Sequence, residues 1–311
     1  MEKETIRQKL TKNKLVSELS RQMYRMMARI NPSWNSARRF RKAYGRRIDW
    51  ENPTTIDEKV MWLKRYVLPK SKLTKRVVDK YLVLDYLREC GCEDVIKECY
   101  GAWDDPKDIP FDALPNSFVL KVTAGCGSHI FCRDKETLDR EKTVRTLRRN
   151  MKKKDYLDFA EMQMVPLHQR VMAERFLEAP PGMLPIDIKI HCFHGEPEQI
   201  MYCYDRDEKT GFARFLFADK DWNLEPDYTI NKSSTPPKRP ESLDKMLECA
   251  RKLAKPFPFV RVDFFEEEGK PIFGEMTFTP CGGTIYYLSD VGHREIGKHL
   301  DISKIDLEHI E

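Results

Sequence analysis

The sequence contains no long hydrophobic run. No apolar stretch approaches the roughly 18–20 residues that a helix needs to cross a bilayer, and the first residues lack the apolar segment of a secretory signal. No internal repeat is visible either. Hydrophobic residues make up 41% and charged residues 34% of the 311 residues, the balance of a globular chain rather than a disordered one. We therefore expect a cytoplasmic protein built as two domains or as one elaborate domain.

The cysteines show no pairing pattern. There are nine of them, an odd number, and their spacing is irregular. Cys90 and Cys92 are too close together for the usual zinc knuckle, and the sequence has no second closely spaced pair that could complete a zinc site with them. We expect free thiols in a reducing compartment.

The positive charge is concentrated at one end of the chain. Residues 1–50 contain 14 Lys or Arg and 4 Asp or Glu, a balance of +10, so the remainder holds 41 against 46, or −5. Apolar residues at helical spacing predict a basic amphipathic helix over 3–30, which Asn31 and Pro32 end. We favour a helix packed on the body with its charges in water; peripheral contact with the inner face of a membrane stays open. No nucleic-acid partner is expected, because neither interleaved aromatic residues nor a known binding module occurs.

Helical patterns come before and between short alternating runs, which favours an α+β fold. Thr55 and Glu58 have the spacing of a capping box at a helix start, and Gly91 is a natural helix end. The region 207–240 is rich in proline and reads as loop. The expected helices cover 56–66, 78–90 and 243–255, and the expected strands cover 118–122, 186–192 and 198–206.

Two acids near the C-terminal end are the most informative residues. Asp263 and Glu275 lie in runs of β-branched and aromatic residues, and the segment between them reads as a hairpin turn. A turn centred on Gly269 places the two acids opposite each other, with Arg261 opposite Thr277 on the same face. Because facing carboxylates repel, the pairing predicts Mg²⁺ between them, which keeps its waters and shares phosphate oxygens. The alternatives are two solvated acids or a bulge that shifts the register.

A glycine-rich loop follows the strand that ends with Lys121. Glycines let backbone N–H groups approach phosphate oxygens, and a lysine just before the loop adds a positive charge. The order differs from the Walker pattern, which places its lysine after the glycines. The loop residues singled out as phosphate contacts are Thr123, Gly125, Gly127, Ser128 and His129.

Two further segments carry weaker signals. The run from Glu174 to Leu177 leaves a strand and precedes a Pro-Pro-Gly loop, so its backbone could meet the edge of an adenine. Asp187, Lys189 and His191 share one face of an alternating strand. That face is either exposed to solvent or part of a site, and the pattern alone favours exposure to solvent.

Taken in order, these motifs resemble the ATP-grasp superfamily, and most closely its TupA-like branch, named for teichuronopeptide biosynthesis. The resemblance spans roughly residues 50–290. It implies an ATP-grasp fold with two α+β subdomains that clamp ATP, preceded by a short helical region. The expected parts are a basic segment over 1–50, a first subdomain over 51–178 and a second over 179–311. The phrases that carry it are Asn52-Pro53-Thr54-Thr55-Ile56-Asp57-Glu58-Lys59, Val78-Asp79-Lys80-Tyr81, Phe257-Pro258-Phe259-Val260-Arg261-Val262-Asp263 and Phe273-Gly274-Glu275-Met276-Thr277-Phe278-Thr279-Pro280.

The resemblance implies a role for each position. The implied contacts to ATP are Lys80 and Lys121 on the phosphates, the loop Thr123–His129 over them, Glu174, Arg175, Phe176 and Leu177 at the adenine, and Asp187 at the ribose. Lys189, Arg206 and Arg261 would act on the transferred phosphoryl group, and Asp263 and Glu275 would bind Mg²⁺. The chain departs from the superfamily at Thr277, where an asparagine is usual, which puts a second metal in doubt.

The implied reaction is ATP-dependent ligation of a carboxylate to an amine through an acyl phosphate. The branch suggests that an amino acid or amine is joined to a small-molecule or saccharide carboxylate in surface-polysaccharide or capsule biosynthesis. One alternative is a glycosyltransferase, since Asp205-Arg206-Asp207 has the form of an Asp-x-Asp metal motif. Another is a kinase on the same scaffold.

Overall fold

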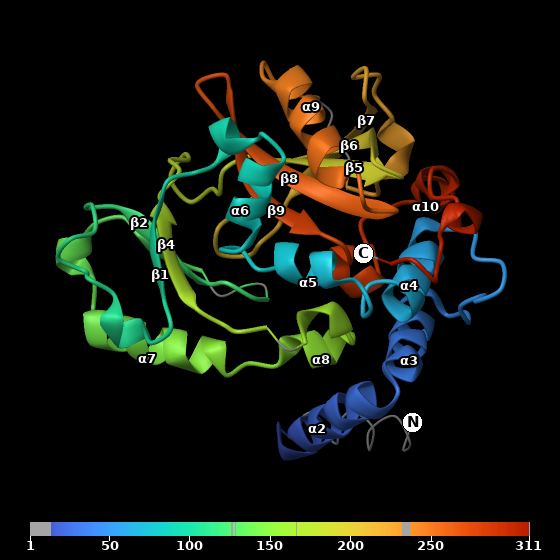
Figure 1. The fold of residues 1–311 in the computed structure, drawn as a ribbon, viewed down its shortest axis with the longest axis horizontal. Coiled ribbons are helices and arrows are strands. Elements are labelled where there is room, and N and C mark those ends of the chain that lie inside the picture. Colours follow the sequence, from blue (N-terminus) through green and yellow to red (C-terminus); the bar gives the residue numbers. More distant parts are fainter. Residues whose placement is uncertain (1–13, 126, 128, 166, 232–236, 311) are drawn as a thin grey trace, which may run out of the picture.

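The computed structural model describes residues 14–125, 127, 129–165, 167–231 and 237–310. Two antiparallel sheets form the body of the protein, one of four strands and one of five, and helices lie against them (Figure 1). The α+β class that the sequence predicts is confirmed. No helix in the described part of the chain is both long and apolar enough to cross a membrane.

Three helices lead into the body. They are α2 (Lys14–Ile30), α3 (Pro32–Tyr44) and α4 (Ile56–Tyr66). The first ends where the sequence predicts, but a helix resumes at once, because the Asn31 side chain accepts a hydrogen bond from the Trp34 N–H and Pro32 suits the first helical position. Residues 3–13 of the predicted helix lie outside the described residues.

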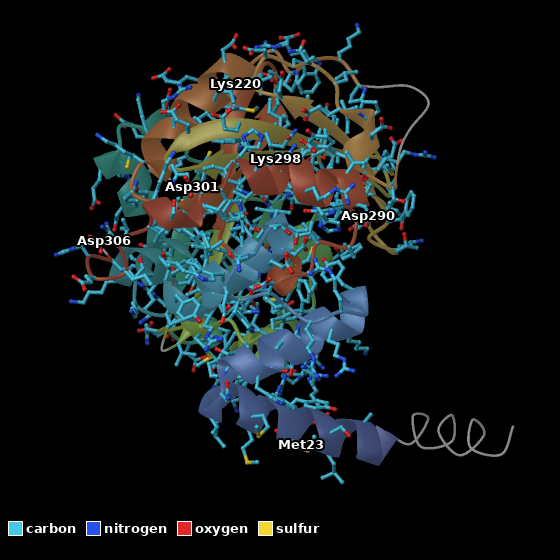
Figure 2. The ribbon with its side chains drawn as sticks, turned by 90° about the vertical axis from the view of Figure 1, so that its right-hand side faces the viewer. Met23, Lys220, Asp290, Lys298, Asp301 and Asp306 are labelled. Atoms are coloured by element: carbon cyan, nitrogen blue, oxygen red, sulfur yellow. The ribbon has the colours of Figure 1, made fainter. Side chains whose placement is uncertain are left out.

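Helix α2 packs on the body as the favoured prediction states, but the face that it packs carries charges that were expected to lie in water. Arg21 and Arg25 turn inward and pair with acids of α8 (Asp155–Phe159), and Ala28 is fully buried. The exposed face instead carries large apolar side chains, and Figure 2 labels Met23 on it, at the edge of the molecule. Charges on the body therefore orient this helix more than apolar contacts do.

The predicted capping box of α4 is confirmed. The Thr55 hydroxyl accepts from the Glu58 N–H at 3.4 Å, and the Glu58 carboxylate accepts from the Thr55 N–H at 3.3 Å. The helix predicted over 78–90 is shorter than expected. The chain forms α5 (Lys72–Val77) and α6 (Val83–Glu89), because the Asp79 carboxylate accepts from the N–H groups of residues 81 and 82 and holds a turn between them.

The first sheet has the strand order β1-β4-β2-β3. Its strands are β1 (Cys99–Trp103), β2 (Phe118–Val122), β3 (Ile130–Cys132) and β4 (Val171–Arg175). Strand β2 matches its predicted range, and both it and β4 are largely buried. Helix α7 (Arg140–Met151) packs on this sheet through Leu147, which lies in one core cluster with Phe118 and Val171.

The second sheet has the order β7-β6-β5-β8-β9. Its strands are β5 (Asp187–Phe193), β6 (Glu196–Tyr204), β7 (Arg214–Asp219), β8 (Phe259–Glu267) and β9 (Lys270–Thr277). The prediction of loop over 207–240 is wrong at β7, where Phe215 and Phe217 are buried and pack near Tyr287. Helix α9 (Leu243–Ala254) covers β5, β6 and β8, and α10 (Asp290–Lys298) contacts α4.

Short 3₁₀ segments join these elements. They are η1 (Glu93–Val95), η2 (Pro106–Asp108), η3 (Lys135–Thr137), η4 (Met162–Met164), η5 (Pro226–Tyr228), η6 (Pro280–Gly283) and η7 (Ile302–Lys304).

The hairpin of β8 and β9 has the predicted pairing for a different reason. Asp263 lies opposite Glu275, but the turn is a two-residue one at Glu268 and Gly269, both with positive φ. A bulge at Gly274 adds one residue to β9 and restores the register. A Cβ at position 274 would lie 3.0 Å from the Asp263 carbonyl oxygen, so this close approach favours glycine.

Candidate active site

The centre of the second sheet carries a compact group of charges. Lys189 on β5 lies opposite Asp263 on β8, which lies opposite Glu275 on β9. The Lys189 Nζ is 2.7 Å from Asp263 Oδ2, and the Arg261 guanidinium meets both Asp263 oxygens at 2.7 Å. The predicted residues of three strands are therefore in direct contact on one face.

These charges are held in a buried setting. Asp263 is 2% exposed and Arg261 is 8% exposed. Burial raises the pKa of the Asp263 carboxyl, but Arg261 and Lys189 lower it more, so that the pKa ends below its usual range. Burial lowers the pKa of Lys189, and Asp187 and Asp263 raise it above its usual range. At neutral pH, then, Asp263 is an anion between two fixed cations.

Glu275 is the open member of the group. Its side chain is 43% exposed, its Oε1 accepts from the Thr277 hydroxyl at 3.0 Å, and the Arg261 Nη2 lies 3.9 Å away. Burial raises the pKa of Glu275, and nearby positive charges, above all that of Lys80, lower it. The lowering is the larger effect, so the pKa of Glu275 lies below its usual value. Lys80 belongs to the turn before α6, so a residue outside the second sheet acts on this carboxylate.

The donor set fits a magnesium ion that takes few ligands from the protein. Among the described residues, no group of three or more His, Cys, Asp or Glu side chains is arranged to hold a metal. Asp263 and Glu275 supply two carboxylates and Thr277 adds a hydroxyl beside them. Asp263 Oδ2 accepts from both Lys189 and Arg261, whereas Oδ1 accepts one bond from Arg261 and keeps further lone-pair capacity. Mg²⁺ commonly binds through one or two carboxylates and completes its shell with water and phosphate oxygens.

The polar face of β5 is buried, whereas the favoured prediction was that it is exposed to solvent. Asp187 and His191 are each 3% exposed. Asp187 Oδ2 lies 2.7 Å from Arg206 Nη1 and 3.1 Å from Lys189 Nζ. The structure thus brings Asp187, Lys189 and Arg206 together, and it joins them to Asp263 through the shared lysine.

The first sheet contributes a second charged group. Lys121 on β2 pairs with Glu174 on β4 at 2.7 Å, and Lys97 pairs with the other Glu174 oxygen. Burial raises the pKa of Glu174, but the charges of Lys121 and Lys97 lower it to about 2. Burial and the charge of Lys121 lower the pKa of Lys97, and although Glu174 raises it, the pKa ends at about 8.

Lys97 is a candidate residue that the sequence did not reveal. It precedes β1 by two positions in a segment without a motif. It reaches Glu174 because β1 pairs with β4, with Cys99 opposite Glu174. Only this long-range pairing distinguishes Lys97 from the many surface lysines of the chain.

The glycine loop lies beside the turn that carries Lys80. The Lys80 Nζ donates to the Gly125 carbonyl at 2.6 Å, and the Lys80 N–H donates to the Thr123 carbonyl at 2.8 Å. Gly125 and Gly127 both have positive φ, which glycine adopts without strain. His129 is exposed, and the charges of Lys121, Lys80 and Glu275 act on its ring. Ser128 lies outside the described residues.

The expected adenine segment is placed at the end of β4. Arg175 Nη1 is 2.8 Å from Glu267 Oε2 on β8, which links the first sheet to the tip of the acid hairpin. Phe176 and Leu177 are 8% and 9% exposed. These three side chains are engaged with the protein itself, so only their backbone groups are candidates for a nucleotide base.

A strained turn follows β9. Cys281 has a φ of +51°, unusual for a residue other than glycine, and Gly282 and Gly283 also have positive φ. The buried Lys64 Nζ donates to the Gly282 carbonyl at 2.9 Å and holds the turn. Burial raises the pKa of the Cys281 thiol, and Arg261 lowers it in part, which gives about 11. The charge of Arg261 reaches this turn, so the turn borders the same group.

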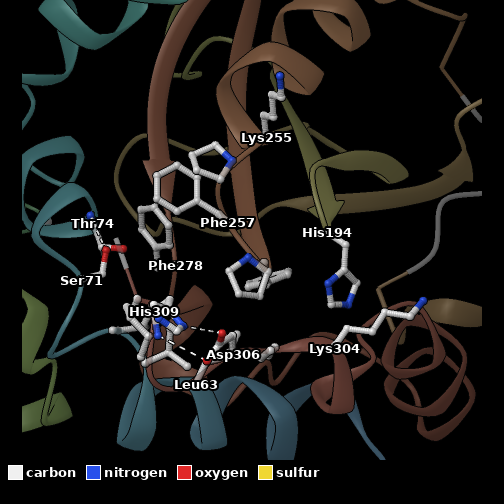
Figure 3. A pocket seen from close by; sticks show the side chains of 17 residues that line it. Leu63, Ser71, Thr74, His194, Lys255, Phe257, Phe278, Lys304, Asp306 and His309 are labelled. Atoms are coloured by element: carbon white, nitrogen blue, oxygen red, sulfur yellow. Dashed lines mark hydrogen bonds and ion pairs between the residues drawn. The ribbon is translucent and has the colours of Figure 1, made fainter.

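A pocket lined mainly by apolar and aromatic residues lies elsewhere. It has a volume of about 400 Å³ and is lined by aromatic residues such as Phe257 and Phe278 and by the C-terminal tail, where His309 and Asp306 share a hydrogen bond (Figure 3). None of the site residues predicted from the sequence lines it. It brings together few charged groups, and we therefore assign the candidate site to the charged face of the second sheet.

Comparisons with known proteins give a matching family model and several similar solved structures. A family model described as TupA-like ATPgrasp matches residues 58–301. No curated protein matches. Among solved structures, the chain is similar to D-alanine–D-alanine ligase from Helicobacter pylori, with 14% identity, a TM-score of 0.44 and coverage of 81% of this chain and 68% of that one.

Two further structures are similar to about the same degree. D-alanine–D-alanine ligase from Bacillus anthracis has 15% identity and a TM-score of 0.42 over 75% of this chain and 67% of that one. D-cycloserine synthetase DcsG has 14% identity and a TM-score of 0.42 over 74% of this chain and 72% of that one. The chain spans only 57% of the B. anthracis ligase complexed with ATP.

Proposed function

The chain belongs to the TupA-like ATP-grasp family, which makes it an ATP-dependent ligase, and we propose that it joins an amine to a carboxylate through an acyl phosphate. The observation that carries the proposal is the contact of Arg261 and Lys189 with Asp263, beside the open carboxylate of Glu275. Such an arrangement offers fixed positive charge next to a place for a divalent ion. That is what a transferring phosphoryl group requires.

The first step transfers the γ-phosphoryl group of ATP to the substrate. A carboxylate oxygen of the acceptor bonds to the γ-phosphorus, the bond to the bridging oxygen breaks, and ADP leaves with the electron pair. Lys80, Lys121 and the N–H groups of the glycine loop would hold the phosphates of the nucleotide. Asp263, Glu275 and the Thr277 hydroxyl would hold Mg²⁺, which when bound offsets the charge of the phosphate oxygens.

The second step forms the amide. The amine nitrogen bonds to the acyl carbon, the bond from that carbon to the phosphate oxygen breaks, and the amine loses a proton. The mechanism needs no nucleophilic side chain. Arg261 and Lys189 are held by Asp263 before any substrate arrives, so their charge is available without rearrangement of the site. Closure of the glycine loop would keep water from the acyl phosphate.

We place the substrates in surface-polysaccharide or capsule biosynthesis. What supports this class is the resemblance to the branch named for teichuronopeptide biosynthesis, together with the family match. The carboxylate would then belong to a uronic acid or to an amino-acid chain, and the amine to an amino acid.

The Asp-x-Asp segment gives no support to a glycosyltransferase. Asp205 Oδ2 lies 3.4 Å from Arg214 Nε, and the Asp207 carboxylate accepts from the N–H groups of residues 209 and 210 in a turn. Arg206, between them, pairs with Asp187. Both acids are engaged in local contacts, and neither pairs with the cations of the site.

Hydroxylamine trapping tests the proposed reaction. The purified protein is incubated with MgATP, a panel of uronic acids and amino acids, and hydroxylamine. A ligase should release ADP only when an acceptor is present and should yield a hydroxamate from the acyl phosphate. A stable phosphoester without a hydroxamate would assign the chain to the kinases instead. Release of a nucleoside diphosphate from a sugar donor, with ATP inert, would contradict the proposal.

A further inference from the structure

Helix α2 presents an apolar stripe to solvent. Leu19, Met23, Met26 and Ile30 are 62%, 47%, 55% and 70% exposed. Their spacings of four, three and four residues place them on one face of the helix. Isolated apolar side chains on a surface are ordinary, but a continuous row of four on one helix marks a contact face. We call these four residues the outer stripe.

The inner face of α2 shows why the stripe points outward. Arg21 and Arg25 both bond to Asp158 of α8, at 2.7 to 3.0 Å. Arg25 is 17% exposed at its side chain and is the more buried of the two. Ala28 is fully buried in a small cluster with Leu157. Ion pairs and a close apolar contact hold this face on the body, which leaves the outer stripe exposed on the described part of the protein.

Basic residues surround this end of the molecule. The last turn of α7 and the residues after it bring Arg149, Lys152 and Lys153 beside Arg21 and Arg25, where together with Asp155 they line a shallow depression. Asp155 and Asp158 offset the charges of Arg21 and Arg25. Exposed basic side chains remain around α2, and we call these five residues the basic rim: Arg29, Arg149, Lys152, Lys153 and Lys154. Within α2 itself, Glu18 is the only acid.

We propose that α2 and this basic rim form a docking surface for an anionic lipid bilayer. An interfacial helix lies in the plane of the membrane with its apolar face buried at the head-group boundary and its basic residues among the lipid phosphates. The outer stripe runs for about 16 Å along the helix, at ~1.5 Å per residue, and the rim lies at the same end of the protein. The surface therefore combines the two elements that such binding requires.

The charge of the rim favours a membrane over a second copy of the chain. Two copies that met through the outer stripe would bring two positive rims together, which opposes association. An anionic surface is complementary to the same charges. The proposal concerns a region outside the ATP site and does not depend on the proposed function.

Vesicle flotation of the full-length protein tests the docking surface. We expect the protein to float with vesicles of phosphatidylcholine mixed with phosphatidylglycerol, and much less with vesicles of phosphatidylcholine alone. The Met23→Glu/Met26→Glu variant should lower the partition coefficient at least about 100-fold, because two buried side chains are lost from the membrane. The Lys152→Ala/Lys153→Ala variant should lower it about 25-fold, since each lysine near an anionic surface contributes about fivefold.

Two matched variants serve as controls. Leu224→Glu/Ile230→Glu changes exposed apolar side chains outside α2. Lys220→Ala/Lys298→Ala removes two charges far from Met23, as Figure 2 shows. Both controls should float as the wild-type protein does.

Three outcomes would overturn the proposal. One is a wild-type protein that fails to float with the mixed vesicles. Another is a Met23→Glu/Met26→Glu variant that floats as well as the wild type. A third is a wild-type dimer in light scattering that this variant converts to a monomer without any vesicle binding, which would assign the stripe to a second copy. ADP release, measured in parallel without vesicles, should be the same in all four variants, so a failed ligase assay would leave the flotation result intact.

Discussion

Replacing Asp263 by asparagine should destabilise the protein as well as inactivate it. The two acids of the hairpin, considered alone, repel each other, so that removing one charge would relieve strain. The structure reverses this expectation, because Asp263 bonds to Arg261 and Lys189 at 2.7 Å in a buried setting. Asparagine keeps the shape of the side chain but removes the charge, which leaves both cations without their shared anion.

The magnitude follows from the burial of the pair. Removing one partner of a buried ion pair costs about 3–5 kcal/mol. Asparagine keeps one acceptor oxygen, which favours the lower end, about 3 kcal/mol, or roughly a 100-fold change in the folding equilibrium constant. In a chain of this size such a loss lowers Tm by roughly 5 °C. Glu275→Gln is the matched control, since the Glu275 side chain is 43% exposed and exposed charge pairs contribute ~0–1 kcal/mol.

Thermal melting followed by circular dichroism, with and without MgATP, measures both effects. Without ligand, Asp263→Asn should melt well below the wild type and Glu275→Gln close to it. With MgATP at about 100 times its Kd, the wild type should gain about 2.7 kcal/mol, and both variants should gain much less. An Asp263→Asn protein as stable as the wild type would refute the ion-pair reasoning. Full MgATP stabilisation in both variants would refute the metal role.

Three other changes test the remaining parts of the site. Gly274→Ala should cost about 1–3 kcal/mol in urea unfolding, because its Cβ would meet the Asp263 carbonyl oxygen at 3.0 Å; an unchanged midpoint would mean that the bulge adapts freely. The Glu174 pKa is about 2 when folded, below its ordinary value, so its contribution is present above about pH 4.5 and is lost as the pH falls toward 2. Wild-type unfolding free energy should therefore drop by about 3 kcal/mol over that range, and a Glu174→Gln variant that shows the same acid limb would assign the drop to other carboxyls. Lys121→Ala should raise the ATP Kd about 10- to 100-fold in calorimetry, whereas an equal rise in Lys97→Ala would give the two lysines one shared role.

The paired lysines on Glu174 suggest how the first sheet prepares for a nucleotide. One carboxylate neutralises part of the charge of Lys121 and Lys97 while both are buried. A bound phosphate would compete for the same ammonium groups. Under the proposed function, binding would exchange an internal anion for the anion of the substrate, and Glu174 would keep the two cations paired when no nucleotide is present.

Local rules determined a good part of the fold from the sequence. The capping box of Thr55 and Glu58 depends on residues three apart, and the strand 118–122 on its own β-branched and apolar side chains. The alternation along β5 and β6 likewise identified a hairpin. The pairing of Asp263 with Glu275 was also predicted, although the bulge at Gly274 was needed to give that register from a shorter turn.

Only the tertiary structure decided which charges meet. The cations on Asp263, the contact of Lys97 with Glu174 and the position of β7 all depend on strand pairing between segments far apart in the chain. Helix α2 also turns Arg21 and Arg25 inward because they pair with Asp155 and Asp158, which lie more than a hundred residues later in the sequence. Residues that are neighbours in the sequence determine the hydrophobic period of each helix and strand and the caps of the helices. Burial and electrostatic partners depend instead on the packing of residues that are far apart in the sequence.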